Sequence, residues 1–280
     1  MRALALLLLM LPLCAGAMEP MSDAALSKVR GRDGMSFNLA NFAMNGDATL
    51  RYTTPGNMGS LSIGNMAVSR SDNTEAPFAD PYMIDVLASP VGRADIITLS
   101  RPLNTAGKEL WQIAYDVAVE SNGTTLGTSL VLKDVAHYGG GMQWTTPRDS
   151  DGLAWGYAVR TDIGSFSVQP NGKSASGEAL VFAGIKIGAA AGDGTVSASP
   201  WRIADVSNQP GIFNARTGAD GKSNLHFGID WPDAGGPGAA VGAITVDNIT
   251  FRSATTGDVN LGSSRIGGVQ IQFLDVKFRQ

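Results

Sequence analysis

The sequence predicts an all-β fold, best described as an antiparallel β-sandwich or β-roll with bulged strands and a short N-terminal helix. Apolar residues alternate with polar or small residues over several runs, tight-turn dipeptides separate these runs, and an apolar pattern with a central break recurs along the chain. Successive side chains of a strand point to opposite faces of the sheet. The alternation therefore indicates strands with one buried face and one solvated face.

The N-terminus has the pattern of a secretory signal peptide. Arg2 supplies the positive charge, Ala3–Leu13 is an apolar run, and Ala15-Gly16-Ala17 places small residues where cleavage after Ala17 would occur. A transmembrane helix needs about 18 apolar residues. This run is shorter and contains Pro12, so we expect residues 1–17 to be a signal peptide. The mature chain would then be exported to the periplasm, the outer membrane surface or the extracellular space.

Composition narrows the chemistry of the mature chain. Cys14 is the only cysteine, so cleavage after Ala17 leaves no disulfide, no cysteine-bound metal and no thiol nucleophile. Leu13 stands where a lipoprotein signal needs a small residue, which disfavours lipidation of Cys14. The chain has 21 Lys and Arg against 25 Asp and Glu and no basic stripe, which argues against nucleic acid as a partner.

Residues 18–34 are expected to form a short helix and a linker. Ser22 is a suitable N-cap, and Asp23 in the first turn complements the helix dipole. Gly31 is a natural helix terminator. The helix is therefore predicted from Asp23 to Arg30.

Residues 35–280 are expected to be a single β-rich domain. The clearest alternating runs are Met35–Leu39, Trp111–Val119, Leu153–Val159 and Leu225–Trp231. Turn dipeptides occur at Asn122-Gly123, Asp151-Gly152, Asn171-Gly172, Asp193-Gly194 and Asp220-Gly221. Short turns of this kind join antiparallel strands and favour hairpins over parallel βαβ units.

A second pattern consists of two apolar residues at a spacing of two, a short gap, and a second such pair. It occurs in full at Leu61/Ile63/Met66/Val68, Leu180/Phe182/Ile185/Ile187, Ile244/Val246/Ile249/Phe251 and Ile271/Phe273/Val276/Phe278. Leu130/Leu132/Val135 and Trp201/Ile203/Val206 follow it in part. The residue before the third apolar position is Asn65, Asp134, Gly184, Asp205, Asn248 or Asp275. These residue types tolerate left-handed backbone, so each break is expected to be a bend in a strand.

The spacing of these breaks bears on the architecture. A bulge at a sheet edge or corner and an arc of a β-solenoid both produce such a break. A solenoid repeats at a regular interval. The patterns begin at residues 61, 130, 180, 201, 244 and 271, which is irregular and favours the sandwich or roll over the solenoid alternative.

No group of residues indicates an enzyme, a cofactor site or a metal site. His137 and His226 lie far apart, and neither has partners at the spacing of a metal site or a catalytic triad. Asp149–Gly152 and Asp220–Asn224 resemble the start of a calcium loop but lack its later ligands. The tryptophans are expected in the core, with a glycan-stacking surface as the alternative; they are Trp111, Trp144, Trp155, Trp201 and Trp231.

The segment Met18–Gly34 carries the one specific resemblance. Its pattern, M-x-P-M-S-D-x-x-L-S-x-V-x-G-R-D-G, resembles the mature start of an uncharacterised family of exported, β-rich gammaproteobacterial proteins. Some members of that family are linked to pilus-like surface systems. The resemblance implies an envelope or surface location and transfers no functional residue.

Together these observations predict a non-enzymatic envelope or surface protein that serves as a structural or adhesive component of a pilus-like system. Its expected partners are other envelope or surface proteins. An outer-membrane β-barrel and a carbohydrate-binding or hydrolytic β-sandwich are the alternatives.

Overall fold

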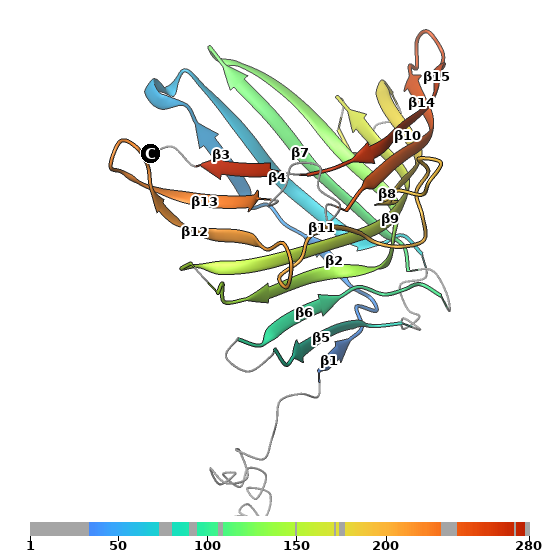
Figure 1. Cartoon of the computed structure of the whole chain (residues 1–280). Coiled ribbons are helices and arrows are strands. Elements are labelled where there is room, and N and C mark those ends of the chain that lie inside the picture. The colour runs from blue at the N-terminus through green and yellow to red at the C-terminus, as the bar shows by residue number, and fades with distance from the viewer. Residues whose placement is uncertain are drawn as a thin grey trace, which may run out of the picture. The chain divides into compact units, whose positions relative to one another are not determined.

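The computed structural model describes residues 34–72, 80–89, 94–105, 109–148, 150–170, 172–173, 177–230, 240–271 and 273–277. The chain divides into two compact units, Met1–Asp33 and Gly34–Gln280. The predicted signal peptide and the predicted helix from Asp23 to Arg30 lie outside the described residues. The strands labelled in Figure 1 belong to the second unit. In the part of the chain that is described, no helix is long and apolar enough to span a membrane.

The second unit is built from antiparallel β-strands that form one 16-stranded sheet. The elements up to residue 121 are β1 Met35–Phe37, β2 Ala43–Asn45, β3 Thr49–Thr53, the 3₁₀ turn Pro55–Asn57, β4 Gly59–Arg70, β5 Tyr82–Leu87, β6 Ile96–Ser100 and β7 Trp111–Ser121. The later strands are β8 Thr124–Thr145, β9 Leu153–Gln169, β10 Ala179–Ala189, β11 Trp201–Ala204, β12 Gly211–Thr217, β13 Ser223–Asp230, β14 Gly242–Arg252, β15 Val259–Val269 and β16 Phe273–Lys277. The all-β, antiparallel prediction is confirmed. The parallel coils of a solenoid are not found among the described strands.

The sheet has two sections, and two long strands, β8 and β9, run through both of them. In the first section, β7 pairs with the N-terminal part of β8 and β10 pairs with the C-terminal part of β9. Strands β2, β3 and β4 extend this section beyond β7, and β14 and β15 extend it beyond β10. In the second section, β6 pairs with the end of β8, and β11 and β12 pair with the start of β9. Figure 1 shows β8 and β9 running through both sections.

A run of three glycines separates the two parts of β8. Gly139, Gly140 and Gly141 have φ values of 73°, 75° and 144°, and the register with β9 shifts by one residue between His137 and Gly140. A Cβ atom at Gly140 or Gly141 would collide with the backbone of β9 or β6. Glycine is therefore required here by backbone conformation and by the close approach of neighbouring strands. Such bends let one strand belong to two differently oriented sections.

A second bend crosses four neighbouring strands of the first section. The registers place Asp134 of β8 opposite Gly164 of β9, Gly164 opposite Gly184 of β10, and Gly184 opposite Asp247 of β14. We call these four residues the bend line. Asp134 and Gly184 have φ values of 55° and 64°, and in β4 the bulged Asn65 has φ 52°. The predicted bends at Asn65, Asp134 and Gly184 are confirmed.

The other three predicted bends differ from expectation. Asn248 does not adopt a positive φ, but β14 is bulged against β15 between Val246 and Ile249. Asp205 begins a turn, where its carboxylate accepts a hydrogen bond of 2.8 Å from the Ser207 N–H. The prediction for Asp275 is wrong, because β16 pairs with β13 in continuous register from Phe273 to Lys277.

The bends keep apolar residues on one face of the first section. Without a bulge, two residues three positions apart in a strand would point to opposite faces. Leu132 and Val135 nevertheless lie in the same hydrophobic cluster, as do Phe182 and Ile185. The buried members of this cluster are Trp111, Val135, Ile163 and Ile185. A second cluster lies on the second section and contains the buried residues Trp155, Ala204 and Ile229.

Candidate interaction surface

The apolar face of the first section continues beyond its core cluster. In its outer part, apolar residues that lie opposite one another on paired strands form three rows across the sheet. The rows are Tyr52/Leu61/Val119/Leu126, then Leu50/Ile63/Val117, then Tyr115/Leu130/Val168/Leu180/Phe251/Val259. We call these residues the apolar face. Because cross-strand neighbours have Cβ atoms about 4.5–5.5 Å apart, each row is a continuous apolar ridge.

Several of these side chains lie in solvent. Leu126, Leu50 and Tyr52 are 76%, 74% and 64% exposed, whereas Val135 in the core cluster is 4% exposed. Exposure is greatest at the ends of β3 and β8. The inner residues of the rows are half-buried. Contiguous exposed apolar surface is typical of sites that contact another molecule.

The opposite face of the same strands is polar. Its side chains pair with one another: Arg51 donates to the Glu120 carboxylate at 2.6 Å, and Ser129 donates to Asp116 at 2.6 Å. Asn65 also donates to Asp116, at 2.9 Å. The first section therefore turns a satisfied polar face to one side and an incompletely covered apolar face to the other.

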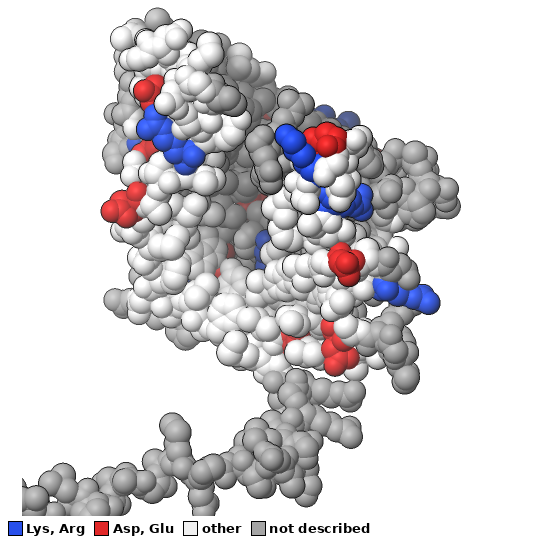
Figure 2. All heavy atoms as spheres, turned by 90° about the vertical axis from the view of Figure 1, so that its left-hand side faces the viewer, with Lys and Arg blue, Asp and Glu red and all other residues white. Residues whose placement is uncertain are grey.

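No residue of the apolar face carries a charge. Charged residues make up 16% of the whole sequence. Figure 2 shows the molecule from the left-hand side of Figure 1, where uncharged side chains cover wide areas between scattered Lys, Arg, Asp and Glu side chains. An uncharged apolar surface offers no electrostatic selectivity, so it favours a partner that is itself apolar.

The two histidines lie in different strands, and no described contact joins them. His137 in β8 is 2.9 Å from the Thr161 hydroxyl through Nδ1, and His226 in β13 is 3.0 Å from the Asn214 side-chain oxygen. Burial, followed by the charge of Arg101, lowers the pKa of His137 to about 4. Both side chains thus make structural hydrogen bonds, and His137 is neutral at ordinary pH.

Of the tryptophans within the described residues, three belong to or pack on the hydrophobic clusters, and Trp201 is buried outside them. Trp111 belongs to the first cluster, and Trp155 stacks on Phe227 with ring centroids 4.6 Å apart. Trp144 packs on the second cluster, and the buried Trp201 donates its indole N–H to the Ala240 carbonyl at 3.1 Å. Trp231 lies outside the described residues. The described rings serve packing, as the sequence predicted.

A buried carboxylate was not singled out in the sequence. Glu109 is 4% exposed and accepts hydrogen bonds at Oε1 from the Tyr82 hydroxyl, at 2.9 Å, and from the Trp111 indole N–H. Burial raises the pKa of Glu109. Burial, together with the Glu109 carboxylate, also raises the pKa of Tyr82. Glu109 and Trp111 are two residues apart, but Tyr82 comes from another strand, so the sequence near Glu109 did not reveal the complete cluster.

The acidic loops do not form a metal site in the part of the chain that is described. No group of three His, Cys, Asp or Glu side chains is found there in a metal-binding arrangement. The Asp220 carboxylate accepts the Lys222 N–H at 3.1 Å, which is the geometry of a turn. Asp149 lies outside the described residues.

Strands β1 to β5 lie in the part of the chain that matches a known family. Residues 1–91 match the model of a family of unknown function, DUF6160. This match includes Met18–Gly34, the segment that carries the resemblance described above. The chain is thus similar to DUF6160 over its first 91 residues, a stretch that contains the β3 and β4 contribution to the apolar face. Comparison with curated proteins and with solved structures found no match.

Proposed function

We propose that this chain is an exported, non-enzymatic protein of the bacterial envelope or cell surface, a structural component of a pilus-like system that self-associates through the apolar face. The observation that carries the proposal is the set of exposed apolar rows on β3, β4, β7 and β8. The export pattern of residues 1–17 and the resemblance of Met18–Gly34 support the location.

The occupant we propose for the apolar face is a second copy of this chain. Strands about 4.8 Å apart, with same-face residues about 6.8 Å apart along each strand, give the thirteen residues of the three rows a projected area of about 420 Å². Two such faces together bury about 850 Å², which is in the size range of weak, concentration-dependent protein interfaces. A second copy always carries a matching uncharged surface, and face-to-face packing of two sheets is a common way to cover apolar rows.

Sedimentation equilibrium of the exported protein tests this proposal. We expect a concentration-dependent dimer that Leu126→Ser weakens at least about tenfold, because burial of one leucine contributes about 1.5–3 kcal/mol and the dimer contains it twice. Thr125→Ala is the matched control, because Thr125 is the neighbouring residue and points to the polar face. A monomer at all concentrations, or equal effects of the two substitutions, would contradict self-association. Recovery of the protein in the cytoplasmic fraction would contradict export.

A further inference from the structure

Strand β15, Val259–Val269, forms one end of the sheet. Among the described strands it pairs with β14 alone, so the backbone N–H and C=O groups that point outward from its other edge have no strand partner there. Figure 1 shows β14 and β15 as a hairpin at the upper right of the view. An open edge of this kind can add a strand from another chain, because its outward backbone groups continue the hydrogen-bonding pattern of the sheet.

The open edge of β15 is long and lightly protected. The other described strands that pair on one side only are three to five residues long, whereas β15 has eleven residues. Natural sheets keep open edges short or place lysine or proline on them. β15 contains neither residue type, and Arg265 is its only charge. Its bulges lie at Leu261 and Gly268, so the stretch Ser263–Gly267 between them can pair regularly.

The side chains of β15 are uncovered as well. Ten of its eleven residues are exposed, and Val259, Leu261 and Ile266 are each exposed by half or more. The third row of the apolar face ends at Val259, so an apolar row reaches the open edge of the sheet. A further strand beside β15 would give these three side chains cross-strand neighbours and would remove part of their apolar surface from water.

We propose that β15 pairs with β15 of a second copy of this chain, in antiparallel orientation around a two-fold axis through Ser264. Pairing of a strand with its own copy is isologous, so this one edge serves both partners. With the axis through Arg265, or with the two strands parallel and in register, the two Arg265 side chains would lie opposite each other. Like charges in that position destabilise a sheet. The axis through Ser264 instead sets Arg265 opposite Ser263 of the second copy.

The edge contact is continuous with the apolar face, which favours a second copy over an unrelated strand. Two antiparallel strands are related by an axis perpendicular to the sheet, so the apolar faces of both copies lie on the same side of one extended sheet. The contact deepens the proposed self-association by adding a second interface, and the two interfaces together would join copies into longer assemblies. Because the bulge-free stretch is short, we expect this contact at higher protein concentrations than the apolar-face dimer. It uses neither β3, β4, β7 nor β8, so each interface can form without the other.

Oxidation of single-cysteine variants of the exported protein tests this pairing, because residues 18–280 contain no cysteine. Residues opposite each other on paired strands have Cβ atoms about 4.5–5.5 Å apart, close to the separation that a disulfide spans. Ser264→Cys is therefore expected to form a disulfide-linked dimer in oxidised glutathione, seen on a gel without reductant. Thr256→Cys, exposed in the turn between β14 and β15, is the matched control and should stay monomeric. A Ser264→Cys protein that stays monomeric, or equal dimer yields from both variants, would overturn the proposal.

A charge exchange at Ser264 tests the two-fold axis, in a Leu126→Ser background that weakens the apolar-face dimer. Ser264→Lys and Ser264→Glu each place like charges opposite each other, so each variant alone should dimerise about fivefold more weakly than the Leu126→Ser parent in sedimentation equilibrium. An equal mixture of the two variants should recover the dimer, because lysine then lies opposite glutamate.

These measurements separate the two interfaces. Failure of the apolar-face proposal would leave the Ser264→Cys disulfide dimer intact, and failure of the edge proposal would leave the effect of Leu126→Ser on the wild-type dimer intact. A mixture that dimerises no better than either charged variant alone would overturn the edge proposal. Disulfide links from Ser264→Cys to a different protein in intact cells, with no dimer of this chain, would also overturn it.

Discussion

Gly184→Ala tests the bend line at the position where the backbone and the neighbouring strand both demand glycine. Gly184 has φ 64°, a left-handed conformation that costs a residue with a Cβ atom about 1–2 kcal/mol. The added Cβ would also collide with the Asp247 carboxylate of β14. The exposed Asp247 carboxylate can rotate away, at the expense of its ion pair with Lys186, whose Nζ is 4.0 Å from it. The Asp247 Cβ, 2.8 Å from the added Cβ, can move only with its backbone. We expect a total loss of about 2 kcal/mol in the free energy of unfolding.

Gly257→Ala is the matched control for this experiment. Gly257 also has a positive φ, 82°, but a Cβ at that position would meet no atom within 4 Å. Its substitution should therefore cost only the backbone part, about 1 kcal/mol. Urea unfolding followed by tryptophan fluorescence measures both values. Adding Asp247→Ala to Gly184→Ala should recover only the part of the difference that comes from the carboxylate, because alanine keeps the Cβ that lies 2.8 Å from the added one. If Gly184→Ala costs no more than Gly257→Ala, the packing of Asp247 over Gly184 is not a constraint on the sheet.

Two further predictions concern buried titratable groups. The pKa of His137 is lowered to about 4 in the folded chain, so its neutral form contributes stability that is complete above pH 6.5 and lost as the pH falls toward 4. In His137→Asn, about 3 kcal/mol of the change in the free energy of unfolding between pH 4 and pH 7 should disappear, as measured by urea unfolding. A pH dependence equal to that of the wild type would contradict this prediction.

Because burial raises the pKa of Glu109, its protonated form favours folding, and that contribution is lost as the pH rises through the folded pKa. Glu109→Gln should therefore gain stability relative to the wild type between pH 4 and pH 7, and a constant difference would argue against a buried, ionising Glu109.

The hairpins could be predicted because their signals are local. The Asn122-Gly123 dipeptide closes the turn between β7 and β8, where both residues have positive φ. Gly, Asn and Asp adopt that conformation most readily, so the turn can be recognised from a dipeptide alone. The bends at Asn65, Asp134 and Gly184 could be predicted for the same reason.

The alignment of these bends depends on register and could not be predicted. In β9 the chain runs in the opposite direction, and the pattern appears there as Thr161, Ile163, Phe166 and Val168 around Gly164. The pattern was not recognised in the sequence because its order is reversed and its first member, Thr161, is polar. At Asp275 the sequence has the pattern but the strand has no bend, because β16 pairs with β13 in continuous register. Residue type therefore permits a bend, and the neighbouring strands decide whether one forms.

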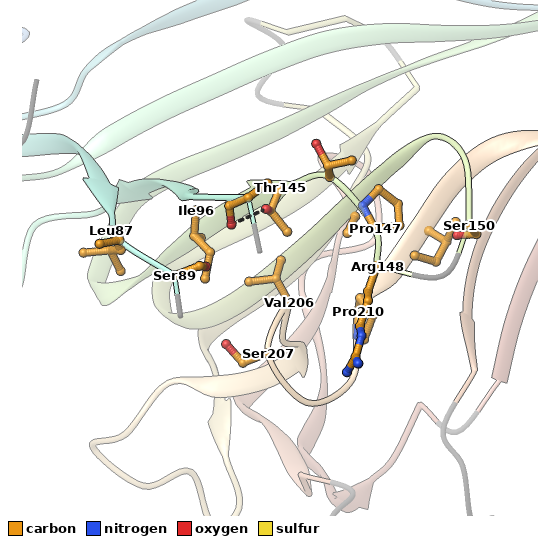
Figure 3. Close-up of a pocket in the computed structure, with 15 residues that line it drawn as sticks. Leu87, Ser89, Ile96, Thr145, Pro147, Arg148, Ser150, Val206, Ser207 and Pro210 are labelled. Atoms are coloured by element: carbon orange, nitrogen blue, oxygen red, sulfur yellow. Dashed lines mark hydrogen bonds between the residues drawn. The ribbon is translucent and has the colours of Figure 1, made fainter. Parts of the chain in front are cut away.

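The candidate sites were beyond the reach of local patterns. Alternation predicted apolar rows on one side of each strand, but it could not say which rows another element covers. A cavity lined by Leu87, Thr145 and Ile212, among others, is assembled from segments that lie between residues 87 and 212 of the chain (Figure 3). Both features follow from long-range pairing, which one sequence does not specify.

Alkylation of single cysteines tests self-association through the apolar face most directly, because residues 18–280 contain no cysteine. Leu126→Cys and Thr125→Cys place a thiol on opposite faces of β8 at adjacent positions. We predict that the maleimide reaction of Leu126→Cys slows as the protein concentration rises, while that of Thr125→Cys does not change. Reaction rates that are independent of concentration at both positions would contradict a dimer formed through the apolar face.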